Sequence, residues 1–189
     1  FTAITQDNIQ AAVDLWVSDN ASAQSTYGPI NSWDVSLITD MRGLFRETTF
    51  NDDISSWDVS NVTTMREMFY DAESFNQDLN DWDVSSVTNM AQMFQSADIF
   101  NGNISSWNVS GVTTMYGMFS GATSFNQDIS SWNMSSATTL TSMFYSASDF
   151  NQDISGWNVS SVTNMRGIFY RATSFNGDLS SWDVSSVTD

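Results

Sequence analysis

Cysteine, histidine and lysine are all absent from the 189 residues of this chain. Without histidine and cysteine it has no Ser-His-Asp triad, no thiolate nucleophile and none of the usual zinc ligands. Without lysine it has neither a P-loop nor a Schiff-base nucleophile. We therefore predict that the protein is not an enzyme and that it uses no cofactor.

Long apolar runs and positive charge are also scarce. No stretch of 18 apolar residues occurs, so we expect no membrane insertion in this segment. Five arginines are the only basic residues against 22 acidic ones, and the formal net charge is −17. Because such a surface repels phosphate backbones, we do not expect nucleic acid as a partner.

What the sequence does contain is a repeat. Tryptophan recurs at one interval of 24 residues and then five of 25, and a Phe-Asn pair keeps the same period. The repeating tryptophans are Trp33, Trp57, Trp82, Trp107, Trp132, Trp157 and Trp182. Periods in this range indicate architectures in which each unit buries its apolar face against its neighbours. We expect the Trp, Met and Phe columns to stack in one continuous core.

Each unit contains two apolar patterns. Ile54, Trp57 and Val59 lie at relative positions 1, 4 and 6, which matches the strand of leucine-rich repeats. Residues 62–72 then carry apolar side chains at about helical spacing, and this spacing predicts two helical turns. The predicted fold class is therefore α/β: a right-handed leucine-rich-repeat-like solenoid of about 25-residue strand-plus-short-helix repeats.

The first thirty residues depart from the repeat. An amphipathic helix is predicted there from the apolar positions Ile9, Ala12, Val13, Trp16 and Val17. Thr5 or Asp7 is the expected cap, and Tyr27-Gly28-Pro29 ends the segment with turn chemistry. We predict that residues 1–30 form an N-terminal capping helix and turn. Residues 31–189 then form a solenoid of about six and a half units with an uncapped C-terminal end.

The repeat motif also resembles a known family. F-N-x-D-I-S-x-W, as in residues 125–132, is similar to the repeats of the BspA-like (DUF285) leucine-rich-repeat surface proteins. The segments Ala12–Trp16 and Tyr27–Ile30 resemble the leader that precedes such arrays. The resemblance implies an extracellular or cell-surface protein that serves adhesion or binds protein or glycan. It brings no catalytic residues.

Two acidic columns are candidate sites. The first is a polar binding face for protein or glycan, with a solvated Asx-Ser stripe as the alternative; it comprises Asp34, Asp58, Asp83, Asn108, Asn133, Asn158 and Asp183. The second is a weak calcium candidate, because stacked carboxylates repel and calcium relieves them. It comprises Asp53, Asp78, Asp128, Asp153 and Asp178. Backbone N–H groups or serine hydroxyls are the alternative partners of these carboxylates, and no other metal site is predicted.

Two further columns and six sequons allow additional hypotheses. The Asn of each Phe-Asn pair is predicted to form a buried ladder along the stack. The Thr column that includes Thr63 and Thr88 predicts either helix N-caps or an ice-binding array. Glycosylation is possible at the N-x-S/T sequons Asn20, Asn61, Asn103, Asn108, Asn133 and Asn158. The alternative to adhesion is a structural filament subunit that self-associates end to end through the open last repeat.

Overall fold

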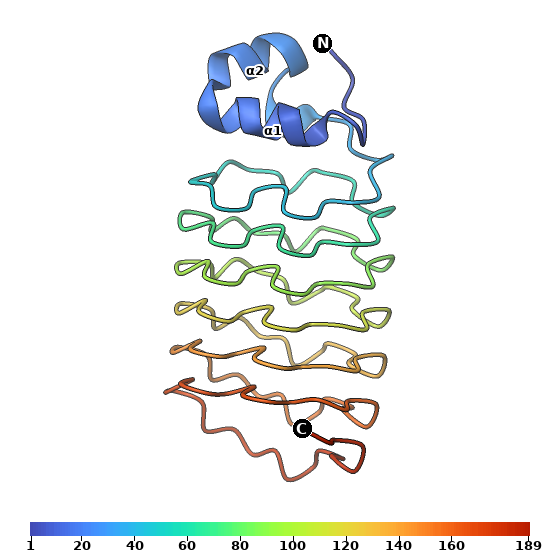
Figure 1. Cartoon of the computed structure of the whole chain (residues 1–189), viewed down its shortest axis with the longest axis vertical. Coiled ribbons are helices and arrows are strands. Elements are labelled where there is room, and N and C mark those ends of the chain that lie inside the picture. Colours follow the sequence, from blue (N-terminus) through green and yellow to red (C-terminus); the bar gives the residue numbers. More distant parts are fainter.

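The structure, a computed structural model, describes all residues 1–189. Two helices lie at one end, and a stack of irregular coils follows them in sequence order along the long axis (Figure 1). Helix α1 spans Ile9–Ser18 and α2 spans Asn20–Tyr27, and the short 3-10 helix η1 spans Ile30–Ser32. Neither α-helix has the length and apolar character that crossing a membrane requires.

Helix α1 confirms the amphipathic helix predicted near the N-terminus. Its apolar face is buried as expected, except that Val17 is 39% exposed. Neither predicted cap is right, because Asn8 occupies the N-cap position and makes no capping bond with its side chain. The predicted turn is present: Gly28 ends α2 with a φ of 81°, a conformation that favours glycine.

Helix α2 has no counterpart among the sequence predictions. It begins after Asp19, whose carboxylate accepts a hydrogen bond from the Ser22 N–H. Ala23 is its one buried residue, so α2 has almost no apolar face from which hydrophobic periodicity could detect it.

Backbone hydrogen bonds join each coil to the next. Every second residue from 41 to 47 donates its N–H to a carbonyl in segment 64–70 of the following coil, at 2.7–3.1 Å. The residues between them bond locally instead, as Leu44 does to the carbonyl of Met41. Alternate N–H groups therefore close turns while the others cross to the neighbouring coil, and only isolated parallel bridges such as Asp40–Thr64 result.

The predicted α/β leucine-rich-repeat-like solenoid is wrong, because the repeat forms neither a strand nor a helix. Where the strand was expected, the Trp57 N–H bonds to the Ile54 carbonyl at 3.1 Å, so a turn rather than a pleat directs both side chains inward. Where the helix was expected, Glu67 and Asp71 have φ values of 57° and 54°. A left-handed residue every fourth position stops a right-handed helix from propagating.

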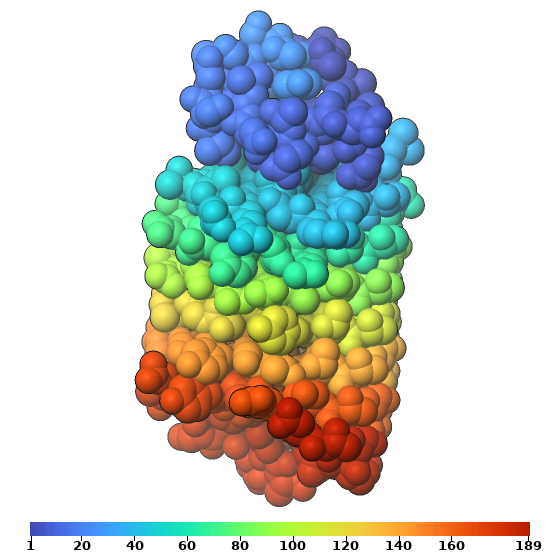
Figure 2. All heavy atoms as spheres, viewed as in Figure 1, coloured from blue at the N-terminus to red at the C-terminus, as the bar shows by residue number.

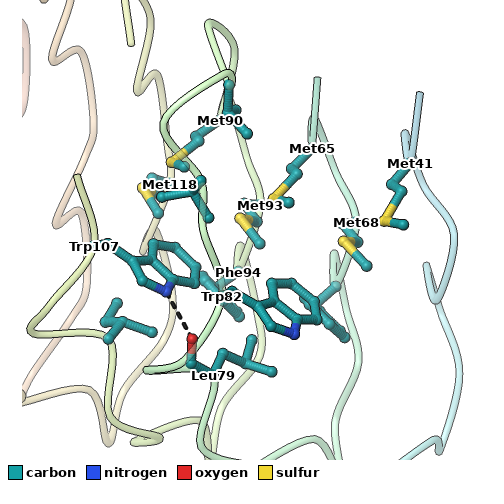
Figure 3. Packing of buried hydrophobic residues seen from close by; sticks show 14 of the residues in the cluster. Met41, Met65, Met68, Leu79, Trp82, Met90, Met93, Phe94, Trp107 and Met118 are labelled. Atoms are coloured by element: carbon teal, nitrogen blue, oxygen red, sulfur yellow. Dashed lines mark hydrogen bonds between the residues drawn. The ribbon is translucent and has the colours of Figure 1, made fainter. Parts of the chain in front are cut away.

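The core is one continuous cluster of 53 buried residues, and no polar or charged residue is buried in the chain. Indole rings stack on neighbouring coils, as in Trp82–Trp107 at 6.5 Å and Trp107–Trp132 at 6.2 Å between ring centroids. Figure 3 shows two of these tryptophans beside rows of methionines from successive coils. The predicted columns of Trp, Met and Phe in one shared interior are therefore confirmed.

Six of the seven repeating tryptophans also bond across coils through the indole N–H, whereas Trp33 donates to the Gly28 carbonyl at 3.0 Å. Trp107 donates to the Leu79 carbonyl at 2.8 Å, which Figure 3 marks with a dashed line. Trp57, Trp82, Trp132, Trp157 and Trp182 make the equivalent bond to the preceding coil at 2.8–3.2 Å. The one polar atom of the indole is thus satisfied inside an otherwise apolar column.

The N-terminal residues close one end of this column, and Figure 2 shows them packed against the first coil. The side-chain oxygen of Gln6 accepts the N–H groups of Thr39 and Asp40, each at 3.0 Å. Trp16 lies edge-on to Trp33 at 5.8 Å and donates its indole N–H to Asp52 at 2.7 Å. In the first coil, the N-terminal residues thus bond the free N–H groups and cover the exposed face of the ring. In the inner coils, a neighbouring coil does both.

Candidate functional site

The predicted binding face runs along the stack with one residue on each coil. In every repeat the Oδ1 atom of its Asp or Asn accepts the backbone N–H of the serine two residues on, at 3.0–3.2 Å. Asp34, Asp58 and Asn158 also accept that serine's hydroxyl. These are Asx-turns, so the column has a structural task in every coil. Ligand binding by this face stays a prediction.

The calcium candidates behave in the same way. Asp53, Asp128, Asp153 and Asp178 accept the N–H of the serine two residues on, at 2.9–3.0 Å. Asp78 instead accepts the N–H of Asn103 from the next coil at 2.8 Å. No group of three or more acidic side chains lies close enough together to hold a metal ion. Backbone and hydroxyl donors, the alternative considered above, are therefore the partners observed.

Seven carboxyl groups of these two columns have a lowered pKa, caused by the hydrogen bonds of their turns. The serine hydroxyl is the main cause of a lowered pKa at Asp34, Asp83, Asp128, Asp153 and Asp183. The serine N–H is the main cause of a lowered pKa at Asp53 and Asp178. An acid–base pair needs two carboxyl groups whose pKa values move apart. All seven of these pKa values move in the same direction.

Acid is therefore expected to destabilise the stack. Each folded pKa lies below the unfolded value of about 3.9, so the stabilisation is present above that pH and is lost as the pH falls through the folded pKa. Melting temperatures measured by circular dichroism should fall as the pH is lowered below about 4. Asp83→Asn is the matched control, because Asn108 already fills the equivalent turn. Its melting temperature should depend less on pH, and a wild-type curve that rises on acidification would contradict the turn assignment.

The Asn ladder forms, but it is not buried. The Oδ1 of Asn51 accepts the Asn76 N–H at 2.9 Å, and the pattern continues up the stack at 2.7–3.1 Å. The predicted pairing along the stack is thus confirmed. The predicted burial is wrong, because the preceding phenylalanine occupies the interior and leaves Asn51 and Asn76 exposed.

The Thr column is also exposed and regular. The hydroxyl of each threonine donates to the carbonyl of its counterpart on the preceding coil at 3.0–3.3 Å. The backbone N–H bonds to the same carbonyl at 2.8–2.9 Å. The predicted helix-capping role is wrong, since no helix follows these residues. Ice binding by this column stays a prediction, as does end-to-end filament assembly.

The six sequons lie in different settings. Asn20 and Asn61 are exposed, but the Nδ2 atom of Asn61, which would carry the glycan, donates to the Ser36 carbonyl at 2.8 Å. Asn103 is half-buried. The remaining three are exposed and occupy Asx-turns on consecutive coils: Asn108, Asn133 and Asn158. Neighbouring coils in such a ladder lie about 4.8 Å apart, which leaves little space between adjacent glycans. Glycosylation stays a prediction.

One surface, which we term the variable face, was not identified from the sequence. It consists of six equivalent segments, 42–47, 66–71, 91–96, 116–121, 141–146 and 166–171. The third and fourth residues of each segment point into the core, and the flanking positions lie mostly at the surface. All five arginines and four of the five tyrosines fall in these segments. This concentration of arginine and tyrosine can be read from the sequence, but the strictly repeated Trp, Phe and Met columns are the more obvious pattern.

Charge divides the variable face into two unequal parts. In the first two segments the arginines are neutralised: Arg42 pairs with Asp40 at 3.2 Å and Arg66 with Glu67 at 2.8 Å, and Arg46 also contacts Glu67. The four segments from residue 91 onward contain no Asp or Glu. Arg166 and Arg171 form no ion pair. In a chain of net charge −17, three of these segments are thus uncharged and the last one is cationic, while the Asp189 carboxylate beside it accepts a hydrogen bond from the Asn164 side chain at 3.4 Å.

Comparison with known proteins identifies one family. The family described as "Mycoplasma protein of unknown function, DUF285" matches residues 16–123 and 100–189, two overlapping segments that cover most of the chain. No curated protein and no solved structure matches this chain. The chain therefore belongs to the DUF285 family, as its F-N-x-D-I-S-x-W motif predicts.

Proposed function

We propose that this chain is a non-catalytic protein of the cell surface or extracellular space that binds a protein or a glycan through its variable face. The family has no assigned function, so the proposal rests on the residues of this chain. The observation that carries it is the distribution of variation. The Trp, Asx-Ser, Asn and Thr columns repeat from coil to coil, whereas the exposed positions of the variable face change at nearly every coil.

The chemistry of that face supports binding. Tyrosine and arginine are enriched in recognition surfaces, because each offers a large contact area together with directional hydrogen bonds. Tyr116 and Tyr170 are 43% and 52% exposed, so both rings are available to a ligand. The acidic columns offer no comparable diversity, since their carboxylates occupy the same turn in coil after coil.

Binding arrays of extracellular proteins and glycans test the proposal. The labelled chain should bind at least one immobilised ligand saturably, and antibodies against it should label intact cells of its source. Replacing Tyr116, Tyr145 and Tyr170 together with serine should reduce array binding at least about tenfold, as expected when aromatic anchors are removed. Tyr116 and Tyr170 are exposed, and Tyr145 is half-buried with its ring stacked on Tyr170, so the melting temperature should fall only modestly.

A matched control separates the variable face from the acidic column. Asp58→Asn combined with Asp83→Asn removes two carboxylates but keeps their turns, because Asn fills the same turn at Asn108 and Asn133. This variant should bind like the wild type. Loss of binding in the control with retention in the tyrosine variant would assign function to the acidic column and overturn the proposal. Absence of any binding on both arrays would also overturn it.

A further inference from the structure

A hollow of about 460 Å³ opens on the part of the variable face whose segments contain no Asp or Glu. Three coils contribute to it, and its lining is Tyr116, Thr141, Ser142, Tyr145, Arg166, Gly167 and Tyr170. Gly167 belongs to this lining and has a φ of 63°; a Cβ atom there would make only ordinary contacts, 3.8 Å from the Ser142 hydroxyl and 4.0 Å from the Tyr145 ring. The rings of Tyr145 and Tyr170, which belong to the lining, stack on each other with their centroids 5.0 Å apart.

Polar groups in the hollow are available for a ligand. The phenolic hydroxyls of Tyr116, Tyr145 and Tyr170 form no hydrogen bond within the protein, and neither does the guanidinium of Arg166. Arg171 lies against the Tyr170 ring, 5.4 Å from its centroid, and adds a second positive charge at the edge. The hollow therefore combines aromatic surface, hydroxyl groups and a guanidinium without an acidic partner.

We propose that this hollow binds an oligosaccharide that carries a single carboxylate. The inference rests on the proposed function and specifies its ligand class and site. Saccharide rings pack against aromatic surfaces while their hydroxyls exchange hydrogen bonds with tyrosine and serine hydroxyls. The carboxylate pairs with Arg166, whose fork of N–H donors matches two carboxylate oxygens.

Size and charge define the ligand further. The hollow is open to solvent, and its volume lies within the range of small-ligand sites, about 300–1,000 Å³, so it has room for a few sugar rings. The acidic columns of the chain repel polyanions, and their field is screened beyond about 8–10 Å at physiological ionic strength. A ligand with one carboxylate pairs with Arg166 and experiences little of that repulsion, whereas nucleic acid or a polyanionic glycan experiences much more.

Calorimetric titration of the whole chain with sialyllactose tests the inference, with the sialyllactose methyl ester and lactose as ligands that lack the charge. Sialyllactose should bind at least about tenfold more tightly than either neutral ligand, the factor expected from one charge-assisted hydrogen bond. Its affinity should fall as salt is raised. Arg166→Gln should lower the affinity for sialyllactose by about tenfold as well.

Arg42→Gln is the matched control. Arg42 occupies the equivalent position on the first coil, but its charge is already paired with Asp40. This variant should bind sialyllactose within about twofold of the wild type. Equal binding of the ester, equal affinity losses in the two variants, or no binding of sialyllactose at millimolar concentration would each overturn the inference. None of these results would remove binding to other ligands on the arrays, so the proposed function is tested separately.

Discussion

Replacing Phe94 with alanine should lower the free energy of unfolding by about 3–5 kcal/mol, the usual cost of removing a buried phenylalanine. Phe94 is fully buried at the centre of the stack. Its ring stacks on Phe69 at 5.4 Å, on Phe119 at 5.7 Å and on Phe100 at 3.9 Å. Because coils on both sides pack against this ring, the cavity has little room to collapse. Urea denaturation followed by circular dichroism measures the loss.

Phe169→Ala is the comparison that isolates position in the stack. Phe169 belongs to the same column and stacks on Phe144 at 5.8 Å, but it is only half-buried. Its replacement should cost clearly less, because less apolar surface returns to water and the site is open on one side. Equal losses at the two positions would show that the coils do not share a continuous interior.

Replacing Trp107 with phenylalanine should lower the free energy of unfolding by about 2–3 kcal/mol. The change leaves a void where the larger indole was and removes the hydrogen bond to the Leu79 carbonyl. That carbonyl keeps its other bond, from the Trp82 N–H at 3.1 Å, so the loss stays below that of a fully unpaired group. Thermal and urea denaturation measure the effect.

Trp182→Phe serves as the reference for this second substitution. Trp182 makes the same bond to Ile154 at 3.0 Å, yet it is only half-buried. Water can replace part of the lost bond there, so the loss should be smaller than at Trp107. A result in which Trp107→Phe is neutral would mean that the indole N–H bonds contribute nothing to joining the coils.

The sequence predicts the packing of this protein better than its backbone. The spacing of the tryptophans is sufficient to place Trp82, Trp107 and Trp132 over one another, because identical units that bury the same face must stack in register. Helix α1 follows from its apolar periodicity. The strand and helix predicted within the unit are wrong. Apolar residues at relative positions 1, 4 and 6 can point inward from turns as well as from a strand, so the spacing does not distinguish the two. The left-handed position did leave a partial signal, because the counterparts of Glu67 in three of the six segments are glycines with positive φ: Gly43, Gly117 and Gly167.

The candidate sites were likewise predicted only in part. Asx-turns at Asp58 and its counterparts follow from Asp or Asn two residues before serine, and the structure contains them in every repeat. The variable face could not be predicted as a surface, because its positions were assigned to a helix. Only the observed turn places Tyr145, Arg166 and Tyr170 around one hollow. Residues from different coils meet there through the inter-coil ladder, which the spacing of apolar residues does not reveal.

Amide chemical-shift mapping tests the central claim most directly, namely that the repeated columns build the stack and the variable face binds the ligand. Two-dimensional NMR spectra would be recorded during titration with the ligand that binds most tightly on the arrays. Shifts should concentrate in segments 116–121, 141–146 and 166–171 and leave the Asx-Ser column unchanged. Shifts that instead follow Asp58, Asp83 and their counterparts along the stack would contradict the account.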